Sequence, residues 1–403
     1  MKILMIAPEP VFRIRGTPFS VRDRCRVLAD LGHTVDLLTY PFGDDFDIPG
    51  VSIHRTRHVP GIRDVKIGFS WQKIPLDALL FFKAVLALHR TRYDVIHTHE
   101  EAGMIGAILG SLFRVPHLYD MHSSLPQQFE NYGTSTAGPV MAFMRWAERV
   151  ILRSSRAVIA ICPHLKDIAQ QSVPDVNVHV IENLAQFQGE QPGPDRRTAV
   201  RREFDLEEAF VIGYTGTFEV NQGLEMMARA FAQVRSRIPD GLLFFAGGTP
   251  EQVKAFRAIA EDLGIGGRLR LPGALPPERM PEIMAACDVL TSPRRIGTNT
   301  PLKLYSYLKS GVPILATDLL THTQVLDDAV AVLTEPTPDG LAQGLLKLYT
   351  RPDLRGELAR AAKQKEETHY SYPAYRDKIQ KLLASVSPSV SPSVSPSVSP
   401  SVS

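Results

Sequence analysis

Cysteine is scarce in this sequence. The 403 residues include three cysteines, Cys25, Cys162 and Cys287, which lie far apart and match neither a CxxC pair nor the spacing of metal ligands. A reducing, cytosolic compartment is the simplest interpretation. Excess charge is also small, with a formal net charge of +2, so the global charge gives no reason to expect nucleic acid as a partner.

Long apolar runs are missing as well. The short run at the N-terminus is interrupted at Pro8, and no signal peptide is expected there. The longest run, from Ile74 to Leu88, is broken by a proline and two charged residues, whereas a membrane-spanning helix needs about 18 or more apolar residues. We expect this run to form a core helix and the protein to be cytoplasmic.

Two signatures of common enzyme classes are also absent. The first predicted strand, 2–7, is not followed by GxGxxG, which counts against a nicotinamide-dependent enzyme. No Ser-His-Asp or Cys-His arrangement follows from the spacing of these residues.

What the sequence does contain is an alternation of strand and helix patterns on both sides of a break. The break is the segment 186–195, QFQGEQPGPD, which lacks apolar periodicity and reads as a linker. Such alternation predicts parallel sheets covered by helices on both faces. We therefore expect an α/β protein with two doubly wound, Rossmann-like domains that face each other across a cleft, where ligands bind at the carboxyl ends of the strands.

The patterns place the strands and helices as follows. Strands are expected at 2–7, 34–39, 51–54, 95–98, 117–119 and 157–161, and then at 210–215, 242–246, 269–271, 289–291, 313–316 and 330–333. Helices are expected at 19–31, 75–89, 102–113 and 140–153, and then at 224–237, 252–263, 281–286, 301–309, 339–349 and 369–383.

One segment carries a local excess of positive charge. Residues 51–92 contain eight basic side chains and two acidic ones, Asp64 and Asp77. The segment is either a solvated basic face or a contact with an anionic membrane surface or a phosphorylated lipid acceptor. In the second case the protein would be peripheral at the inner face of the plasma membrane.

The segment 291–318, TSPRRIGTNTPLKLYSYLKSGVPILATD, is the most informative. Thr300 is expected to cap a helix that begins with Pro301. The free N–H groups of that helix start, with Gly297 allowing close backbone approach, would form an anion site for a diphosphate. The cations around it are Arg294, Arg295 and Lys303.

Polar residues and glycines stand at other predicted strand ends. His97, His99 and Glu100 come at the end of the strand that starts at 95, but no partner cluster with metal-ligand spacing exists, so we expect no metal site. His99 and Glu100 are instead placed at the border of the acceptor. Gly247 and Gly248 follow the strand 242–246, where the missing side chains let the backbone approach a base or a ribose.

These stretches carry a family resemblance. PLKLYSYLKSGVPILATD is similar to the segment of glycosyltransferase family 4 that usually reads P-x-K-x-x-E-Y-M-x-x-G-x-P-x-V-A-T. DVIHTHE, LYDMHSS, IGYTGTFEVNQGLEMMARAF and LLFFAGGTP match other landmarks of that family in order, so the resemblance extends from Lys2 to about Leu383. It implies the GT-B fold, catalysis without a metal or other cofactor, and retention of the donor's anomeric configuration.

The resemblance also implies a division of the chain. Residues 1–185 would form the acceptor-side domain, 186–368 the domain that binds the nucleotide sugar, and 369–384 a helix that crosses back to the first domain. From Ser385 onward the chain repeats Ser-Val-Ser-Pro, a composition that cannot build a core. We expect residues 385–403 to be disordered.

By the same resemblance, several residues would contact the substrates. His122, just past the strand 117–119, would lie against the transferred sugar and act with Arg294 and Lys303 as the catalytic set. Gly16 and Thr17, in the loop after the first strand, would meet the donor phosphate and the acceptor. The other substrate-binding residues would be Gly216, Thr217, Gln222, Gly297, Thr298, Asn299, Thr300, Pro301, Leu302 and Ser306.

The sequence departs from the family at charged positions. Thr298 and Ser306 stand where the family usually carries its Glu-x7-Glu pair, and Thr217 and Gln222 stand where it carries the Arg and Lys that hold the diphosphate. A diphosphate carries about two to three negative charges and needs compensation in a closed cleft. We favour a site rewired onto the three cations of the 291–318 segment over one that has lost catalysis.

The favoured function is a hexosyltransferase that uses a nucleoside-diphosphate sugar and a glycan, lipid-linked or small-molecule acceptor. The leaving phosphate can take the acceptor's proton, so the protein's tasks are to orient both substrates and to stabilise negative charge. Two rivals stay open: a sugar-nucleotide epimerase on the same fold, and a catalytically inactive GT-B subunit that binds a sugar nucleotide or a partner.

Overall fold

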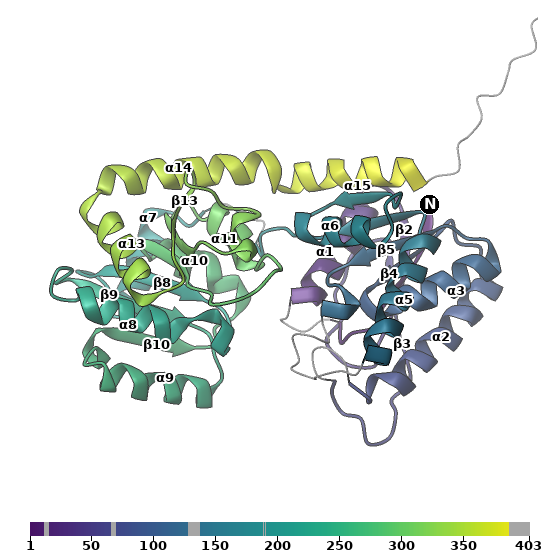
Figure 1. Ribbon diagram of the computed structural model, residues 1–403, viewed down its shortest axis with the longest axis horizontal. Helices are drawn as coiled ribbons and strands as arrows, with labels where there is room; N and C mark the ends of the chain where they lie inside the picture. Colours follow the sequence, from purple (N-terminus) through teal and green to yellow (C-terminus); the bar gives the residue numbers. More distant parts are fainter. Residues whose placement is uncertain (12–15, 66–69, 128–137, 188, 190, 387–403) are drawn as a thin grey trace, which may run out of the picture.

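The structure, a computed structural model, describes residues 1–11, 16–65, 70–127, 138–187, 189 and 191–386. It consists of two parallel β-sheets, each packed between helices, that lie side by side along the long axis of the molecule (Figure 1). The expectation of an α/β protein with two doubly wound halves is confirmed.

The N-terminal sheet has seven strands within the described residues, in the order β3-β2-β1-β4-β5-β6-β7, and each neighbouring pair is parallel. Its strands are β1 (Lys2–Ala7), β2 (Thr34–Thr39), β3 (Val51–Arg55), β4 (Val95–His99), β5 (His117–Met121), β6 (Ala157–Ala160) and β7 (Val178–Val180). Its helices are α1 (Gly16–Asp30), α2 (Lys73–Arg90), η1 (Glu100–Ala102), α3 (Gly103–Phe113), α5 (Gly138–Ser154) and α6 (Pro163–Ser172).

The C-terminal sheet has six strands within the described residues, in the order β10-β9-β8-β11-β12-β13, again all parallel. Its strands are β8 (Phe210–Thr215), β9 (Gly241–Ala246), β10 (Leu269–Gly273), β11 (Val289–Ser292), β12 (Ile314–Thr317) and β13 (Ala331–Thr334). Its helices are α7 (Pro194–Glu203), η2 (Val220–Gln222), α8 (Leu224–Val234), α9 (Pro250–Asp262), η3 (Gly266–Arg268), η4 (Pro277–Arg279), α10 (Met280–Ala285), α11 (Lys303–Lys309), α12 (Leu320–Thr323), α13 (Pro338–Thr350) and α14 (Pro352–His369).

The order of strands reverses once in each sheet, between β1 and β4 and between β8 and β11. The connections that leave these neighbouring strands run to opposite faces of the sheet, so their carboxyl ends are where a doubly wound sheet binds a ligand. The loops that carry the candidate residues leave the sheets at or beside these two points.

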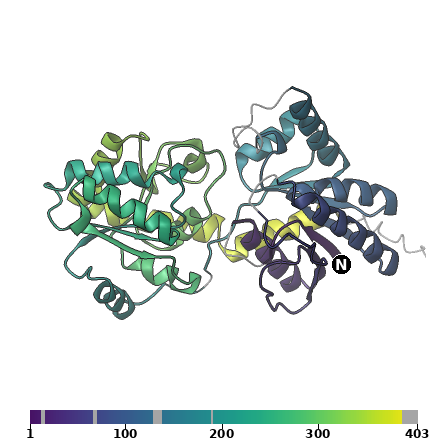
Figure 2. The ribbon, with the colours of Figure 1, turned by 90° about the horizontal axis from the view of Figure 1, so that it is seen from below.

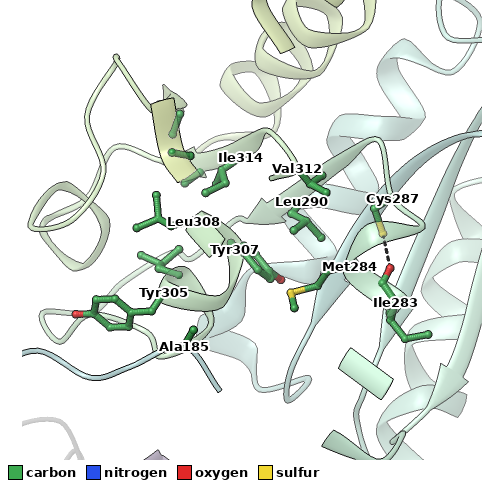
Figure 3. Close-up of a cluster of buried hydrophobic side chains, with 14 of the residues drawn as sticks. Ala185, Ile283, Met284, Cys287, Leu290, Tyr305, Tyr307, Leu308, Val312 and Ile314 are labelled. Atoms are coloured by element: carbon green, nitrogen blue, oxygen red, sulfur yellow. Dashed lines mark hydrogen bonds between the residues drawn. The ribbon is translucent and has the colours of Figure 1, made fainter. Parts of the chain in front are cut away.

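Both sheets are held by strands that are apolar on both faces. All six residues of β8, FVIGYT, and all six of β9, GLLFFA, are buried, as expected for parallel strands covered on both sides. One cluster in the C-terminal half packs Met284 of α10 and Leu290 of β11 against Tyr307 and Leu308 of α11 (Figure 3). This packing fixes α11, the helix that carries several candidate residues.

The last two helices run across both halves of the molecule (Figure 1). α14 packs against α11 and α13, whereas α15 (Tyr372–Val386) packs against α1 and β6 of the N-terminal half. Tyr375, Ile379 and Leu382 of α15 belong to the apolar core there. The Lys378 ammonium also meets Glu182 Oε2 at 2.6 Å.

The boundary expected for the tail is wrong by two residues. Ser385 and Val386 belong to α15, and Val386 is 2% exposed because it completes the apolar stripe that faces α1. The rest of the expected disordered segment, 387–403, lies outside the described residues.

The sequence patterns do not predict α6, β7, α7 and α14. α7 has one buried residue, Val200, and α6 has two, Leu165 and Ala169, so neither shows a clear apolar stripe. α7 also begins at Pro194, inside the expected linker. β7 is three residues long, and none of them is fully buried.

α2, expected as a core helix, is buried on one side only. Leu76, Leu80, Ala84 and Leu88 face the sheet, while the opposite side is both apolar and exposed. No helix in the described ranges combines the length and the apolar character that crossing a bilayer requires.

The packing of α15 leads to a prediction about stability. Leu382→Ala should lower the free energy of unfolding by about 2–5 kcal/mol, because it leaves a cavity between α15 and the N-terminal sheet. Lys381→Ala, at an exposed position one residue earlier, is the control and should change it by less than about 0.5 kcal/mol. Urea unfolding measures both, and equal effects would contradict the contribution of α15 to the N-terminal core.

Candidate active site

Residues from distant parts of the chain meet at the switch point of the C-terminal sheet. Gly216 follows β8, Arg294 follows β11, and Lys303 is the first residue of α11. Gln222 ends η2, between β8 and α8. The fold therefore brings together four of the expected site residues.

α11 is tied to the end of β8 by a buried tyrosine. The Tyr307 hydroxyl accepts a hydrogen bond from the N–H of Thr215, the last residue of β8, at 2.9 Å. Tyr305 and Leu304 are also fully buried (Tyr305 is labelled in Figure 3). Because these side chains hold the helix, Lys303 is fixed beside the loop that follows β8.

Lys303 is a half-buried cation. Its Nζ donates to Oε1 of Gln222 at 3.0 Å and lies 3.8 Å from the centre of the Tyr214 ring. Burial, with a smaller contribution from the Arg294 guanidinium, lowers the pKa of Lys303 well below its usual value. No carboxylate in the described part of the chain pairs with Lys303, so the protein leaves this charge unbalanced.

Arg294 is the second unbalanced cation. Its Nη1 donates to Oγ1 of Thr321 at 3.1 Å and to the carbonyl of Asn299 at 3.3 Å, while its Nε is buried without a hydrogen-bond partner. Burial lowers the pKa of Arg294, and no described carboxylate pairs with it. Arg295, the third expected cation, is exposed, and its N–H donates to the carbonyl of Asn221 at 3.1 Å.

Two glycines are required for this arrangement. Gly216 has a φ of +139°, and a Cβ there would lie 3.1 Å from Nζ of Lys303. A Cβ at Gly247 would lie 1.8 Å from the carbonyl oxygen of Gly216, which no side chain can occupy. Gly248 lies against the Phe218 ring in the same way, and Gly297 lies beside Arg294.

The helix start expected at Thr300 and Pro301 is wrong. α11 begins at Lys303, because the N–H groups of Leu304 and Tyr305 bond to the carbonyls three residues before them and form a tighter turn. Leu302 is the residue before the helix, and no side chain caps it. The charge at this point therefore comes from the side chains of Arg294 and Lys303 rather than from a capped helix end.

The positions that depart from the family have other partners here. Ser306 is buried, and its hydroxyl accepts a hydrogen bond from the N–H of Gln186 at 2.9 Å. The carbonyl of Thr298 accepts from Nε2 of Gln324 at 2.7 Å. Thr217 is exposed, and its carbonyl accepts from the Tyr214 hydroxyl at 2.7 Å.

On the N-terminal side, His122 is the centre of a buried polar cluster. Its Nε2 lies 3.0 Å from Nδ1 of His99 and 3.3 Å from Oδ1 of Asp120. Burial lowers the pKa of His122 to about 4, although the Asp120 carboxylate acts in the opposite direction. The imidazole is therefore neutral at pH 7. His99 has no exposed surface and lies behind His122.

Arg24 of α1 balances this cluster. Its Nε donates to Oδ2 of Asp120 at 2.8 Å, and both side chains are fully buried. Burial alone would raise the pKa of Asp120, but the Arg24 guanidinium and the neighbouring imidazoles outweigh it and hold that pKa well below its usual value. His97, His99 and Asp120 lie close enough to bind a metal ion, but Arg24 already supplies a positive charge at that point.

Glu100 borders the cluster as a carboxyl group with a raised pKa. It has a φ of +49° and accepts a hydrogen bond from the Ser123 hydroxyl at 2.9 Å. Burial, followed by the charge of Glu101, raises the pKa of Glu100 to about 8. Glu101 itself pairs with Lys73 at 2.7 Å.

Several contacts between described residues join the two halves beside these clusters. Nδ2 of Asn299 donates to the carbonyl of His122 at 3.0 Å. Oε1 of Gln324 accepts from the N–H of His164 at 2.9 Å, while its Nε2 holds Thr298. Gly16, at the start of α1, faces Leu302 and is followed by the half-buried Thr17. The loop between β11 and α11 therefore touches the residue that follows β5.

Arg24, Asp120 and Tyr214 also belong to these clusters, although the sequence patterns did not predict them. The sequence could have indicated a buried ion pair at Arg24, because this residue falls on the apolar stripe of α1 with Val21, Cys25 and Leu28, where a charge requires a partner. The pairing of Arg24 with Asp120 joins residues 96 positions apart, and that contact follows only from the fold.

Comparisons with known proteins identify the family of the chain. Residues 15–183 match the family model of the glycosyl transferase 4-like domain, and residues 195–365 match that of the glycosyl transferases group 1. The chain is 23% identical over 353 residues to a D-inositol 3-phosphate glycosyltransferase of Corynebacterium jeikeium, and the aligned part covers 82% of this chain and 83% of that relative.

Solved structures share the fold at low identity. HepE of Anabaena in complex with UDP superposes with a TM-score of 0.75 at 18% identity, over 96% of this chain and all of that one. Sucrose-phosphate synthase of Thermosynechococcus elongatus superposes with a TM-score of 0.76 at 19% identity, over 95% of this chain and 98% of that one. The chain thus belongs to the glycosyltransferases of the GT-B fold that join a glycosyl transferase 4-like domain to a group 1 domain.

Proposed function

We propose that this protein transfers a hexose from a nucleoside-diphosphate sugar to a glycan, lipid-linked or small-molecule acceptor, without a metal and with retention of configuration. The observation that carries the proposal is the pair of cations at the switch point of the C-terminal sheet. Lys303 and Arg294 are desolvated and have no described carboxylate partner, so a bound diphosphate would balance their charges.

The surroundings of the two cations suit a nucleotide. Gly216 and Gly247 keep the backbone free of side chains next to Lys303, and we assign this space to the diphosphate and the ribose. Anabaena HepE, a protein of the same fold, was solved in complex with UDP, which supports a nucleotide as the ligand. Arg295, Thr217 and Thr298 are exposed or half-buried beside it and are proposed as further contacts to the donor.

His122 is proposed to position the transferred sugar. Its carbonyl is bonded to Asn299, which belongs to the same loop as Arg294, so the two candidate groups are linked across the junction of the halves. A neutral imidazole suits this role because it can hydrogen-bond to a sugar hydroxyl without adding charge beside the anomeric carbon.

The chemistry proposed for the chain uses no protein nucleophile. The acceptor oxygen attacks the anomeric carbon on the face from which the diphosphate leaves, and the leaving phosphate oxygen takes the acceptor's proton. Lys303 and Arg294 stabilise the negative charge that grows on the leaving group, and they are already desolvated before the reaction begins. Glu100, Gly16 and Thr17 are proposed to border the acceptor, and His99, which has no exposed surface, would act there through His122.

Release of the nucleoside diphosphate from a panel of UDP- and GDP-sugars tests the proposal, since slow hydrolysis of the donor needs no known acceptor. At least one donor should be cleaved, at the same rate within about twofold in EDTA and in Mg²⁺, because Lys303 and Arg294 would supply the charge that a metal otherwise provides. Activity that is lost in EDTA and restored by Mg²⁺ or Mn²⁺ would contradict metal independence. Binding of UDP without cleavage of any donor would instead favour a non-catalytic subunit.

Substitution of His122 tests its role in the reaction. His122→Ala should lower kcat by roughly 10²-fold, or about 2.7 kcal/mol, with little change in the affinity for free UDP, because the lost contact is to the sugar. His117→Ala is the matched control, since His117 is also buried, at the start of the strand β5 that ends just before His122, but bonds to the Thr98 and Ser155 hydroxyls. The control should lower the melting temperature and leave kcat within a few-fold. A His122→Ala protein that melts earlier yet turns over normally would end the assignment.

A further inference from the structure

The outer surface of the N-terminal half has an unusual composition. α2, α3 and α5 lie side by side on the face of the sheet opposite α1 and α15 (Figure 2). The His89 ring at the end of α2 meets the Phe113 ring at the end of α3 at 5.0 Å, and α3 packs along α5. We call the solvent side of these three helices the outer face.

The outer face is apolar where solvated helices are polar. Eight of the twelve large apolar side chains that are exposed in the described residues belong to these three helices. The most exposed of these eight are Phe82 and Leu112, each 68% exposed, and the rings of Phe143 and Trp146 of α5 lie against each other with centres 5.6 Å apart. An apolar surface of this extent on a single face marks a contact with another molecule or with a membrane.

The charges on the outer face have one sign. Arg145, Arg149 and Arg153 stand four residues apart along α5 and are exposed, and Arg90 ends α2. The carboxylates of the three helices are Asp77 and Glu148.

Neither of these two carboxylates is available to the arginines. Asp77 accepts a hydrogen bond from the Tyr40 hydroxyl, and Glu148 is 3% exposed and accepts from the N–H of Leu125. By contrast, α8 of the C-terminal half pairs Arg229 with Glu225 on its exposed side. The outer face therefore offers positive charge that its own helices do not neutralise.

We propose that the outer face docks on a bilayer that contains anionic lipids. Apolar side chains would enter the region between headgroups and acyl chains, and the arginines would meet lipid phosphates around them. A second copy of this chain fits less well, because a two-fold contact would set the arginine row of α5 against itself with no exposed carboxylate to pair with it.

This surface differs from the one that the charge of residues 51–92 suggests. Arg55 is bonded to Asp45 at 2.6 Å, Lys73 to Glu101, and Lys83 to the carbonyl of Arg55, so these cations are engaged within the protein. Lys66 lies outside the described residues. α2 contributes mainly its apolar side, and α5, beyond that segment, contributes the arginine row.

The orientation of the helices places the docked surface near the candidate site. In a parallel sheet the helices start at the carboxyl edge of the strands, so Ile74 of α2 and Phe143 of α5 lie toward the edge that carries His122. A membrane on the outer face would bring a lipid-borne acceptor close to that edge. The docking itself stands without the proposed reaction, because it depends on no residue of the junction.

Flotation of the full chain with vesicles tests the docking. Vesicles of phosphatidylcholine with one quarter phosphatidylglycerol should bind the protein at least tenfold more strongly than pure phosphatidylcholine, and added salt should weaken the binding. Arg145→Glu with Arg149→Glu should reduce binding by roughly tenfold or more, and so should Phe82→Ser with Trp146→Ser. Because all four positions are exposed, the variants should melt within a few degrees of the native protein.

Arg202→Glu with Arg360→Glu is the matched control. Both arginines are exposed on the C-terminal half, and the pair makes the same change in net charge, so binding should stay within about twofold. Equal losses in the control and outer-face variants would overturn the proposal. Absence of binding to either vesicle would also overturn it, as would a native dimer that the Phe82→Ser and Trp146→Ser variant converts to monomers.

Discussion

The candidate site depends on two positive charges that no carboxylate of the described residues balances. Lys303 is desolvated, and among the described residues its ammonium contacts the amide of Gln222 and the ring of Tyr214, while Arg294 has a buried Nε for which these residues provide no hydrogen-bond partner. Such an arrangement is costly in the unbound protein, since a buried cation gains most from a charged partner. The buried tyrosines of α11 hold Lys303 in place. Gly216 and Gly247 keep the space next to Lys303 free of side chains.

In the N-terminal half, by contrast, the buried charges of the cluster around His122 are paired within the protein. Arg24 and Asp120 are fully buried and balance each other, so the imidazoles around them remain neutral and His122 is held in one place. In the proposed reaction, the balanced cluster would position the sugar and the unbalanced cations would bind the diphosphate of the donor. The hydrogen bond from Asn299 to the carbonyl of His122 joins the two clusters, so the position of the loop between β11 and α11 depends on the N-terminal half.

The sequence predicted the fold well, because its strands are continuous apolar runs and its longer helices show a clear period. It failed where burial is slight, as in α7, where Val200 alone is buried, and where a local turn decides the start of a helix, as at Lys303. The cations of the 291–318 segment could be predicted as site residues from the sequence, because arginine and lysine stand next to glycine and proline there. That no described carboxylate pairs with them could not be predicted, since this depends on which acidic side chains the fold places next to them. Arg24 shows the converse: a charge on an apolar stripe signals a buried partner, but only the sheet topology identifies Asp120.

Calorimetric titration of UDP against the native protein and Lys303→Ala tests the central claim most directly. The native protein should bind UDP at least tenfold more tightly than it binds uridine, and Lys303→Ala should lose about tenfold or more in affinity for UDP with little change for uridine, as loss of one charge-assisted contact of ~1.5–3 kcal/mol implies. Lys309→Ala on the same helix, where the ammonium lies over the Phe187 ring, is the control and should leave both affinities unchanged. Equal affinity of the native protein and Lys303→Ala for UDP would contradict the claim that the unbalanced cations exist to hold a diphosphate.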